Sequence, residues 1–133
     1  MSGEVRVPIN GDIDIVTARQ RGRDLALQLG FAGSDLTVIA TAISEVSRNI
    51  VTYAARGEII LQPAQEPNRR GIVVIARDEG PGMPSVEDAL RDGFSTGNSL
   101  GLGLPGARRL MDDFEIQSAV GKGTTVTMKK WVR

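Results

Sequence analysis

The sequence contains no cysteine and no histidine among its 133 residues. The absence of cysteine excludes disulfides and thiolate metal sites, and it removes any sign of an oxidising compartment. The absence of histidine excludes catalytic triads with an imidazole base and metal sites built on imidazole. Lysine and arginine together number 16, as do aspartate and glutamate, so the formal net charge is zero. A general electrostatic attraction to nucleic acid is therefore not indicated.

Long apolar runs are also missing. No stretch approaches the roughly 20 apolar residues that a membrane-spanning helix needs, and the N-terminal segment MSGEVRVPIN lacks the apolar stretch of a signal peptide. We therefore expect a cytoplasmic protein with no membrane partner. Apolar residues make up 41% and charged residues 24%, which is ordinary globular composition. The length predicts one domain spanning residues 1–133.

Hydrophobic spacing in the first half predicts a strand followed by two helices. Apolar residues alternate over residues 5–9, and Pro8 favours an edge position for that strand. Spacings of three and four predict a helix over residues 14–29. They predict a second helix from Ser34, expected to cap it, to about Tyr53 or Ala55.

The second half predicts two hairpins. Apolar runs at 58–62 and 71–76 indicate the first, with a long polar connection between them. After this hairpin the pattern predicts a short helix over 85–91, a helix over 105–110, and a second hairpin of strands 114–118 and 124–131. Hairpins exclude a wholly parallel sheet. The expected class is therefore α+β, a two-layer sandwich whose mixed, mostly antiparallel sheet carries helices on one face.

Glu45 and Asn49 form the first candidate pair for chemistry. They lie four residues apart in the second predicted helix, so at about 100° per residue they share one edge beside the apolar stripe. A Glu-x-x-x-Asn pair on a helix edge is most often a solvated polar shoulder. On an edge that faces a cleft, the carboxylate could take a proton from an attacking hydroxyl, and the amide oxygen could bind Mg²⁺.

Asp78, Gly80 and Gly82 follow the predicted strand 71–76. Aspartate and glycine are common turn residues, which gives a purely structural interpretation. In the functional interpretation, the glycines allow a ligand to approach the backbone closely, and Asp78 accepts a hydrogen bond from an exocyclic amine such as that of adenine.

The segment GLGLPG, residues 101–106, matches G-x-G-x-x-G by letter. A dinucleotide fold would need a strand directly before it, but the preceding DGFSTGNSL is a polar loop. Two interpretations remain: free amides at a helix N-terminus that attract phosphate oxygens, or a flexible loop before a helix started by proline. No G-x-x-x-x-G-K-[ST] segment is present, which excludes a P-loop. Taken alone, GKGTT at 121–125 indicates a tight hairpin.

Together, these four segments resemble the GHKL (Bergerat-fold) ATPase family. ISEVSRNI is similar to its N box, DEGPGM to its first glycine box, GLGLPGARRL to its second, and GKGTTV to the segment that ends the nucleotide site. Order and spacing agree over residues 35–128. The short chain resembles the small anti-sigma-factor serine-protein kinases. Within that branch, DIVTARQRGRDLALQLGF, DGFSTG, RLMDDF and KWVR resemble the switch kinases of stressosomes.

The resemblance implies a role for each matching residue, with ATP and Mg²⁺ as cofactors. Glu45 would be the general base, Asn49 would coordinate Mg²⁺, and Asp78 would bind the adenine amino group. The remaining nucleotide contacts would come from Gly80, Gly82, Gly101, Leu102, Gly103, Gly106 and Thr124 or Thr125. Residues 92–100 would form a lid. Relatives often carry a histidine shortly after the asparagine; this chain has none, so no role for such a group follows.

The implied function is transfer of the ATP γ-phosphate to a serine or threonine of STAS-domain proteins, the scaffold and antagonist of a stressosome. The kinase would then be released to activate a downstream phosphatase or similar effector. Three alternatives remain open: an anti-sigma factor kinase that binds a sigma factor directly, a nucleotide-dependent binding module without turnover, and a simple ATP hydrolase.

Overall fold

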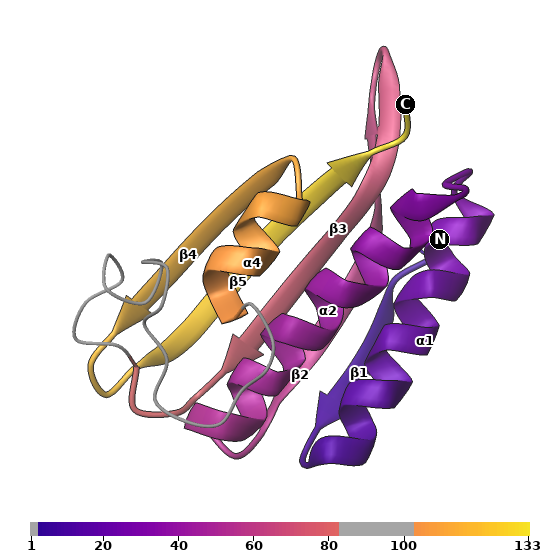
Figure 1. The fold of residues 1–133 in the computed structure, drawn as a ribbon. Coiled ribbons are helices and arrows are strands. Elements are labelled where there is room, and N and C mark those ends of the chain that lie inside the picture. Colours follow the sequence, from indigo (N-terminus) through magenta and orange to yellow (C-terminus); the bar gives the residue numbers. More distant parts are fainter. Residues whose placement is uncertain (1–2, 83–102) are drawn as a thin grey trace.

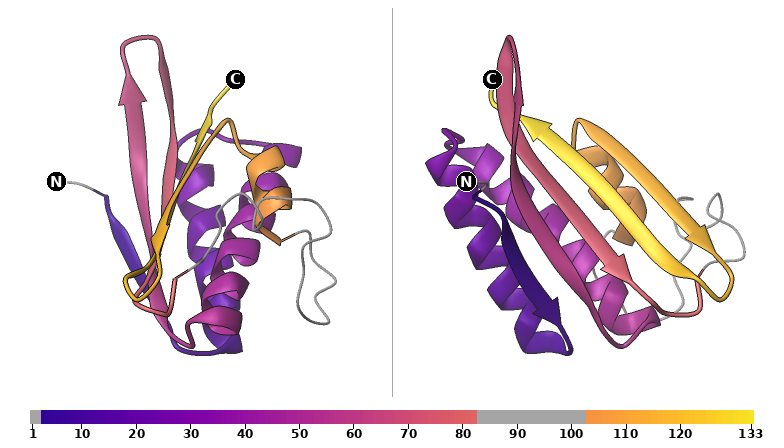
Figure 2. Two further views of the ribbon diagram at one scale, coloured as in Figure 1. Left: turned by 90° about the vertical axis from the view of Figure 1, so that its left-hand side faces the viewer. Right: turned by 180° about the vertical axis from the view of Figure 1, so that it is seen from behind.

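The computed structural model describes residues 3–82 and 103–133. They form a five-stranded sheet in the order β1-β2-β3-β5-β4, with every neighbouring pair antiparallel. The strands are β1 (Val5–Ile9), β2 (Gly57–Glu66), β3 (Arg69–Asp78), β4 (Asp113–Ala119) and β5 (Gly123–Trp131). Helices α1 (Asp12–Gln28), α2 (Ser34–Tyr53) and α4 (Gly103–Leu110) cover one face (Figures 1 and 2).

The expected two-layer α+β architecture is confirmed, with one correction. The sheet of the described residues is wholly antiparallel, not mixed. The reason lies in the connections: tight turns join β2 to β3 and β4 to β5. Two helices that run in opposite directions return the chain from β1 to the opposite direction in β2 (Figure 1). β1 lies at the sheet edge, as Pro8 predicts.

The helices begin slightly differently from the expectation. α2 starts at Ser34 itself, so Ser34 is not its cap; Gly33 holds that position at φ +62, without a side-chain capping hydrogen bond. Glycine adopts positive φ at little cost, so a backbone turn replaces the expected serine cap. α4 starts at Gly103 and ends, as expected, at Leu110. The helix expected over 85–91 lies outside the described residues.

The first hairpin is longer than expected, and the predicted long polar connection is wrong. Only residues 67–68 separate β2 from β3. β1 pairs with residues 57–61, so among the described strands the rest of β2 has no partner on that side. Pro63, which lacks an N–H, is tolerated beside that edge. The hairpin therefore continues past its neighbours and projects from the sheet, as Figure 1 shows.

Among the helices described, none is long and apolar enough to cross a membrane.

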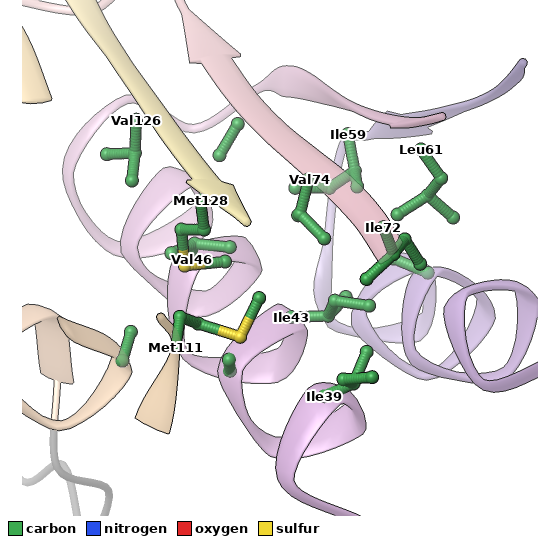
Figure 3. Close-up of a cluster of buried hydrophobic side chains, with 14 of the residues drawn as sticks. Ile39, Ile43, Val46, Ile59, Leu61, Ile72, Val74, Met111, Val126 and Met128 are labelled. Atoms are coloured by element: carbon green, nitrogen blue, oxygen red, sulfur yellow. The ribbon is translucent and has the colours of Figure 1, made fainter. Parts of the chain in front are cut away.

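The core lies between the helices and the sheet (Figure 3). α2 supplies its centre, with Ile43 and Val46 fully buried against side chains of β3 and β5. Full burial of one such side chain contributes about 1.5–3 kcal/mol. α1 packs closely on α2 at Gly22, where an added Cβ would overlap Cδ1 of Ile43. This packing on both sides fixes the rotation of α2 and hence the direction of its polar edge.

Ser47 on α2 is fully buried, and its hydroxyl is the only buried side-chain polar atom without a hydrogen-bond partner in the described part of the chain. We expect Ser47→Ala to raise the free energy of unfolding by up to about 1 kcal/mol, because the change removes an unpaired buried hydroxyl. Denaturant unfolding measures this difference. Ser44→Ala is the matched control, since the Ser44 hydroxyl donates to the Ala40 carbonyl at 3.0 Å. A Ser47→Ala variant less stable than the parent would contradict the prediction.

Candidate active site

Glu45 is a buried carboxylate on the polar edge of α2, with 7% of its surface exposed. Its Oε1 accepts a hydrogen bond from the backbone N–H of Gly103 at 3.0 Å. Its Oε2 lies 3.6 Å from Nη1 of Arg48, whose side chain is 44% exposed. These partners offset the cost of burying a charged group. The carboxylate is therefore held between the first residue of α4 and a half-exposed guanidinium.

Asn49 lies one turn further along the same edge of α2. It is half-buried. Its amide oxygen is a suitable hard ligand for Mg²⁺, which in nucleotide sites takes few protein ligands and keeps substrate phosphates and waters around it. No group of three or more acidic side chains that could bind a metal on their own occurs in the described residues.

The N-terminus of α4 offers backbone donors beside Glu45. Gly103 has φ +66, which favours glycine, and Pro105 contributes no N–H. The free amides of a first helical turn attract anions, and the helix dipole adds to that attraction. Gly106 is the fourth residue of α4 and is buried within it. Gly101, Leu102 and the expected lid at 92–100 lie outside the described residues.

Asp78 ends β3 on the face covered by the helices, with 8% of its surface exposed. Its Oδ1 accepts a hydrogen bond from the Gly80 N–H at 2.9 Å. A Cβ at Gly80 would lie 2.6 Å from Cβ of Ala54, so the chain passes directly over the C-terminal end of α2. Packing within the protein alone is therefore sufficient to require glycine at position 80.

Gly82 lies against the hairpin that joins β4 to β5. Its φ is +77, and an added Cβ would overlap the carbonyl oxygen of Ala119. The neighbouring Pro81 carbonyl accepts a hydrogen bond from the Gly121 N–H at 2.8 Å. These contacts attach the segment after β3 to the β4–β5 turn.

The register of the sheet separates the two candidate threonines. Thr124 pairs directly with Asp78, so both side chains lie on the helix-covered face, and Thr124 is 5% exposed. Thr125 pairs with Arg77 and, because strand residues alternate, points to the opposite face. The structure therefore brings Thr124 to Asp78 and does not bring Thr125 there.

Helix α2 connects the two groups of candidate residues. Glu45 on its polar edge contacts the start of α4, and Ala54, which caps its C-terminal end, contacts Gly80. Asn49 lies between these two contacts. The carboxylate, the amide, the N-terminus of α4 and the acidic end of β3 are thus arranged along one helix, α2.

Two residues beside these positions were not expected from the sequence. Arg48 follows Glu45 at i,i+3, a spacing at which helical side chains meet, so the sequence held that signal. Ser118 lies opposite Thr124 in the β4–β5 ladder, and its Oγ is 2.8 Å from Oγ1 of Thr124. Only the register of the hairpin, counted from its turn, would have identified Ser118.

Comparisons with known proteins identify the family of this chain. Residues 12–130 match the family described as histidine kinase-like ATPase domain, and the chain belongs to that family. Over 133 residues, which is all of both chains, it is 45% identical to the serine/threonine-protein kinase RsbT of Bacillus subtilis. It is 34% identical over 113 residues to the anti-sigma F factor of Caldanaerobacter subterraneus, covering 80% of this chain and 78% of the relative.

A solved structure supports the fold. The mycobacterial sensor histidine kinase MprB matches with a TM-score of 0.58 and 17% identity, covering all of this chain and 99% of the other. At that identity the likeness concerns the fold alone. The full-length match and the family match confirm the expected GHKL-type ATPase fold and the expected enzyme class, an ATP-dependent protein kinase.

Proposed function

We propose that this protein transfers the γ-phosphoryl group of MgATP to a serine or threonine hydroxyl of a STAS-domain protein. The observation that carries the proposal is the 3.0 Å hydrogen bond between Glu45 and the Gly103 N–H. It joins a candidate base on α2 to the helix N-terminus that is expected to hold phosphates. The full-length similarity to a serine/threonine-protein kinase supports the same reaction.

In this proposal Glu45 is the general base that accepts the proton of the acceptor hydroxyl. Asp78 accepts a hydrogen bond from the adenine amine, and Thr124 lies beside it. Gly103, Gly106 and the undescribed Gly101 and Leu102 line the phosphates, while Gly80 and Gly82 shape the backbone below the nucleotide. Thr125 is no longer included, because it faces the other side of the sheet.

Phosphoryl transfer depends mainly on alignment and charge stabilisation, with little covalent chemistry for the protein to perform. The chain would hold both ends of ATP, the adenine at the end of β3 and the phosphates at α4. This would align the γ-phosphate with the acceptor hydroxyl. Asn49 would hold Mg²⁺, which supplies charge neutralisation when bound. Glu45 lies at the phosphate end and would remove the proton as the hydroxyl attacks.

The partners in the proposal are the STAS-domain scaffold and antagonist of a stressosome, followed by a downstream phosphatase or similar effector in the cytoplasm. We also propose that the 133 residues form one domain, since the described elements share one sheet and one core.

A second candidate function is that of an anti-sigma factor kinase that binds a sigma factor directly. The 34% identity to an anti-sigma F factor favours it.

A label-transfer experiment tests the proposal. The protein is mixed with γ-³²P-labelled ATP, Mg²⁺ and a candidate STAS-domain protein, and we expect label on the STAS-domain protein. Free phosphate without labelled protein would indicate an ATP hydrolase. A tight complex without label would indicate a binding module. A parallel pull-down with a sigma factor separates the second candidate, because only that candidate requires a stable sigma complex.

A further inference from the structure

Three polar side chains form a row across the end of the sheet. Asp78 on β3 pairs with Thr124 on β5, and Thr124 pairs with Ser118 on β4. Cross-strand partners point to the same face, so all three side chains lie on the helix-covered side. The next row is apolar: Ala76 and Val126 belong to the core, and Ile116 packs against it. The polar row is thus the boundary between the core and the candidate adenine site.

The hydrogen bonds in this row fix the direction of the hydroxyl protons. Ser118 Oγ donates to the carbonyl oxygen of Gly123 at 3.1 Å. A serine hydroxyl has one proton, so Ser118 cannot donate the same proton to Thr124. The 2.8 Å contact between the two hydroxyls must then use the proton of Thr124. Thr124 Oγ1 consequently has only lone pairs left for any further partner.

We propose that Ser118 is a positioning residue that makes this site select an amino group over a carbonyl group at position 6 of the purine. The proposal rests on the proposed adenine site. Asp78 and Thr124 both present acceptors, and two acceptors fit the amine of adenine. The 6-carbonyl of hypoxanthine or guanine would place an acceptor against acceptors and leave buried groups unpaired, which lowers affinity.

The expected effect of Ser118→Ala follows from the hydroxyl proton of Thr124, which loses its acceptor. Without Ser118 Oγ, the Thr124 hydroxyl can rotate and donate to a 6-carbonyl. Inosine triphosphate carries a 6-carbonyl and an N1–H where ATP has the 6-amine and an unprotonated N1. The preference for ATP over inosine triphosphate should therefore fall about tenfold, in line with one hydrogen bond. Ser118→Thr keeps a hydroxyl on a strand-compatible side chain and should restore the preference.

The measurement is the ratio of dissociation constants for ATP and inosine triphosphate, by calorimetry on the full chain with Mg²⁺. Gln117→Ala is the matched control, because Gln117 is the adjacent residue on β4 and is exposed on the opposite face. A merely structural role for Ser118 would weaken both nucleotides together and leave the ratio unchanged. Circular dichroism checks that each variant is folded.

Thr124→Val is a second, isosteric variant, which removes the hydroxyl lone pairs of Thr124. It should reduce the preference for ATP over inosine triphosphate, and it tests the inference even if Ser118→Ala does not fold. An unchanged ratio in the folded variants, or failure of Ser118→Thr to restore it, overturns the inference while leaving the nucleotide site intact. If the parent protein binds neither nucleotide, the proposed adenine site and the inference both fail.

Discussion

Glu45→Gln is expected to lower the rate of label transfer to the protein acceptor by about 10²–10⁴, the usual contribution of a general base. Glutamine keeps an acceptor oxygen for the Gly103 N–H, which Glu45 accepts at 3.0 Å in this structure. The contact between α2 and α4 is therefore retained while the proton acceptor is lost. Nucleotide affinity should change little. The measurements are single-turnover transfer of ³²P and, separately, the dissociation constant for ATP.

Glu58→Gln is the matched control for this experiment. Glu58 lies on β2, is paired with Arg6 and Arg77, and is only half-buried. Neutralising it changes the net charge by the same amount on the sheet face opposite the helices, since its neighbour Ile59 faces the core. Transfer by Glu45→Gln at the parent rate would remove Glu45 from the role of base.

Asp78→Asn is expected to weaken ATP binding by about 10- to 100-fold, because a hydrogen bond to a charged group contributes about 1.5–3 kcal/mol. Asparagine can still accept the hydrogen bond from the Gly80 N–H, which lies 2.9 Å from Oδ1 of Asp78. The turn after β3 should therefore persist, and the loss should appear in affinity and not in folding. Calorimetric titration with ATP measures it.

Asp24→Asn serves as the control, since Asp24 is exposed on α1. It makes the same chemical change on the outer surface of the molecule. Equal ATP affinity for Asp78→Asn and the parent protein would contradict the adenine contact. A loss of thermal stability together with affinity would indicate that Asp78 acts mainly on the fold of the turn.

The parts of the fold that follow from local periodicity were predictable. The stripe of α2 and the alternation in β1 each depend on one segment alone, so their positions agree with the structure to within a few residues. The β2–β3 hairpin was predicted too short because Pro63 and its polar neighbours look like a turn in isolation. Their place in a strand depends on pairing with β3 where β1, which begins opposite Leu61, no longer covers β2, and no local pattern reveals this.

The candidate site also has a part that local patterns predict and a part that depends on tertiary packing. Helical spacing alone predicts that Glu45 and Asn49 share an edge. The contact of Glu45 with Gly103 depends on how α4 packs on α2, across 58 residues of sequence, and could not be derived from either segment. Likewise, the choice between Thr124 and Thr125 depends on the pairing of β3 with β5. A shift of one residue in that register would exchange the two faces.

The hydrogen bond from Gly103 to Glu45 also has a consequence for the order of events in a reaction cycle. A backbone amide carries a single hydrogen, so it serves one acceptor at a time. A phosphate oxygen that takes this hydrogen displaces the carboxylate, and the carboxylate then turns to whatever hydroxyl is nearby. Arrival of the nucleotide and release of the Glu45 carboxylate from the Gly103 N–H would thus be a single exchange. Without nucleotide, the carboxylate would stay bound to that N–H.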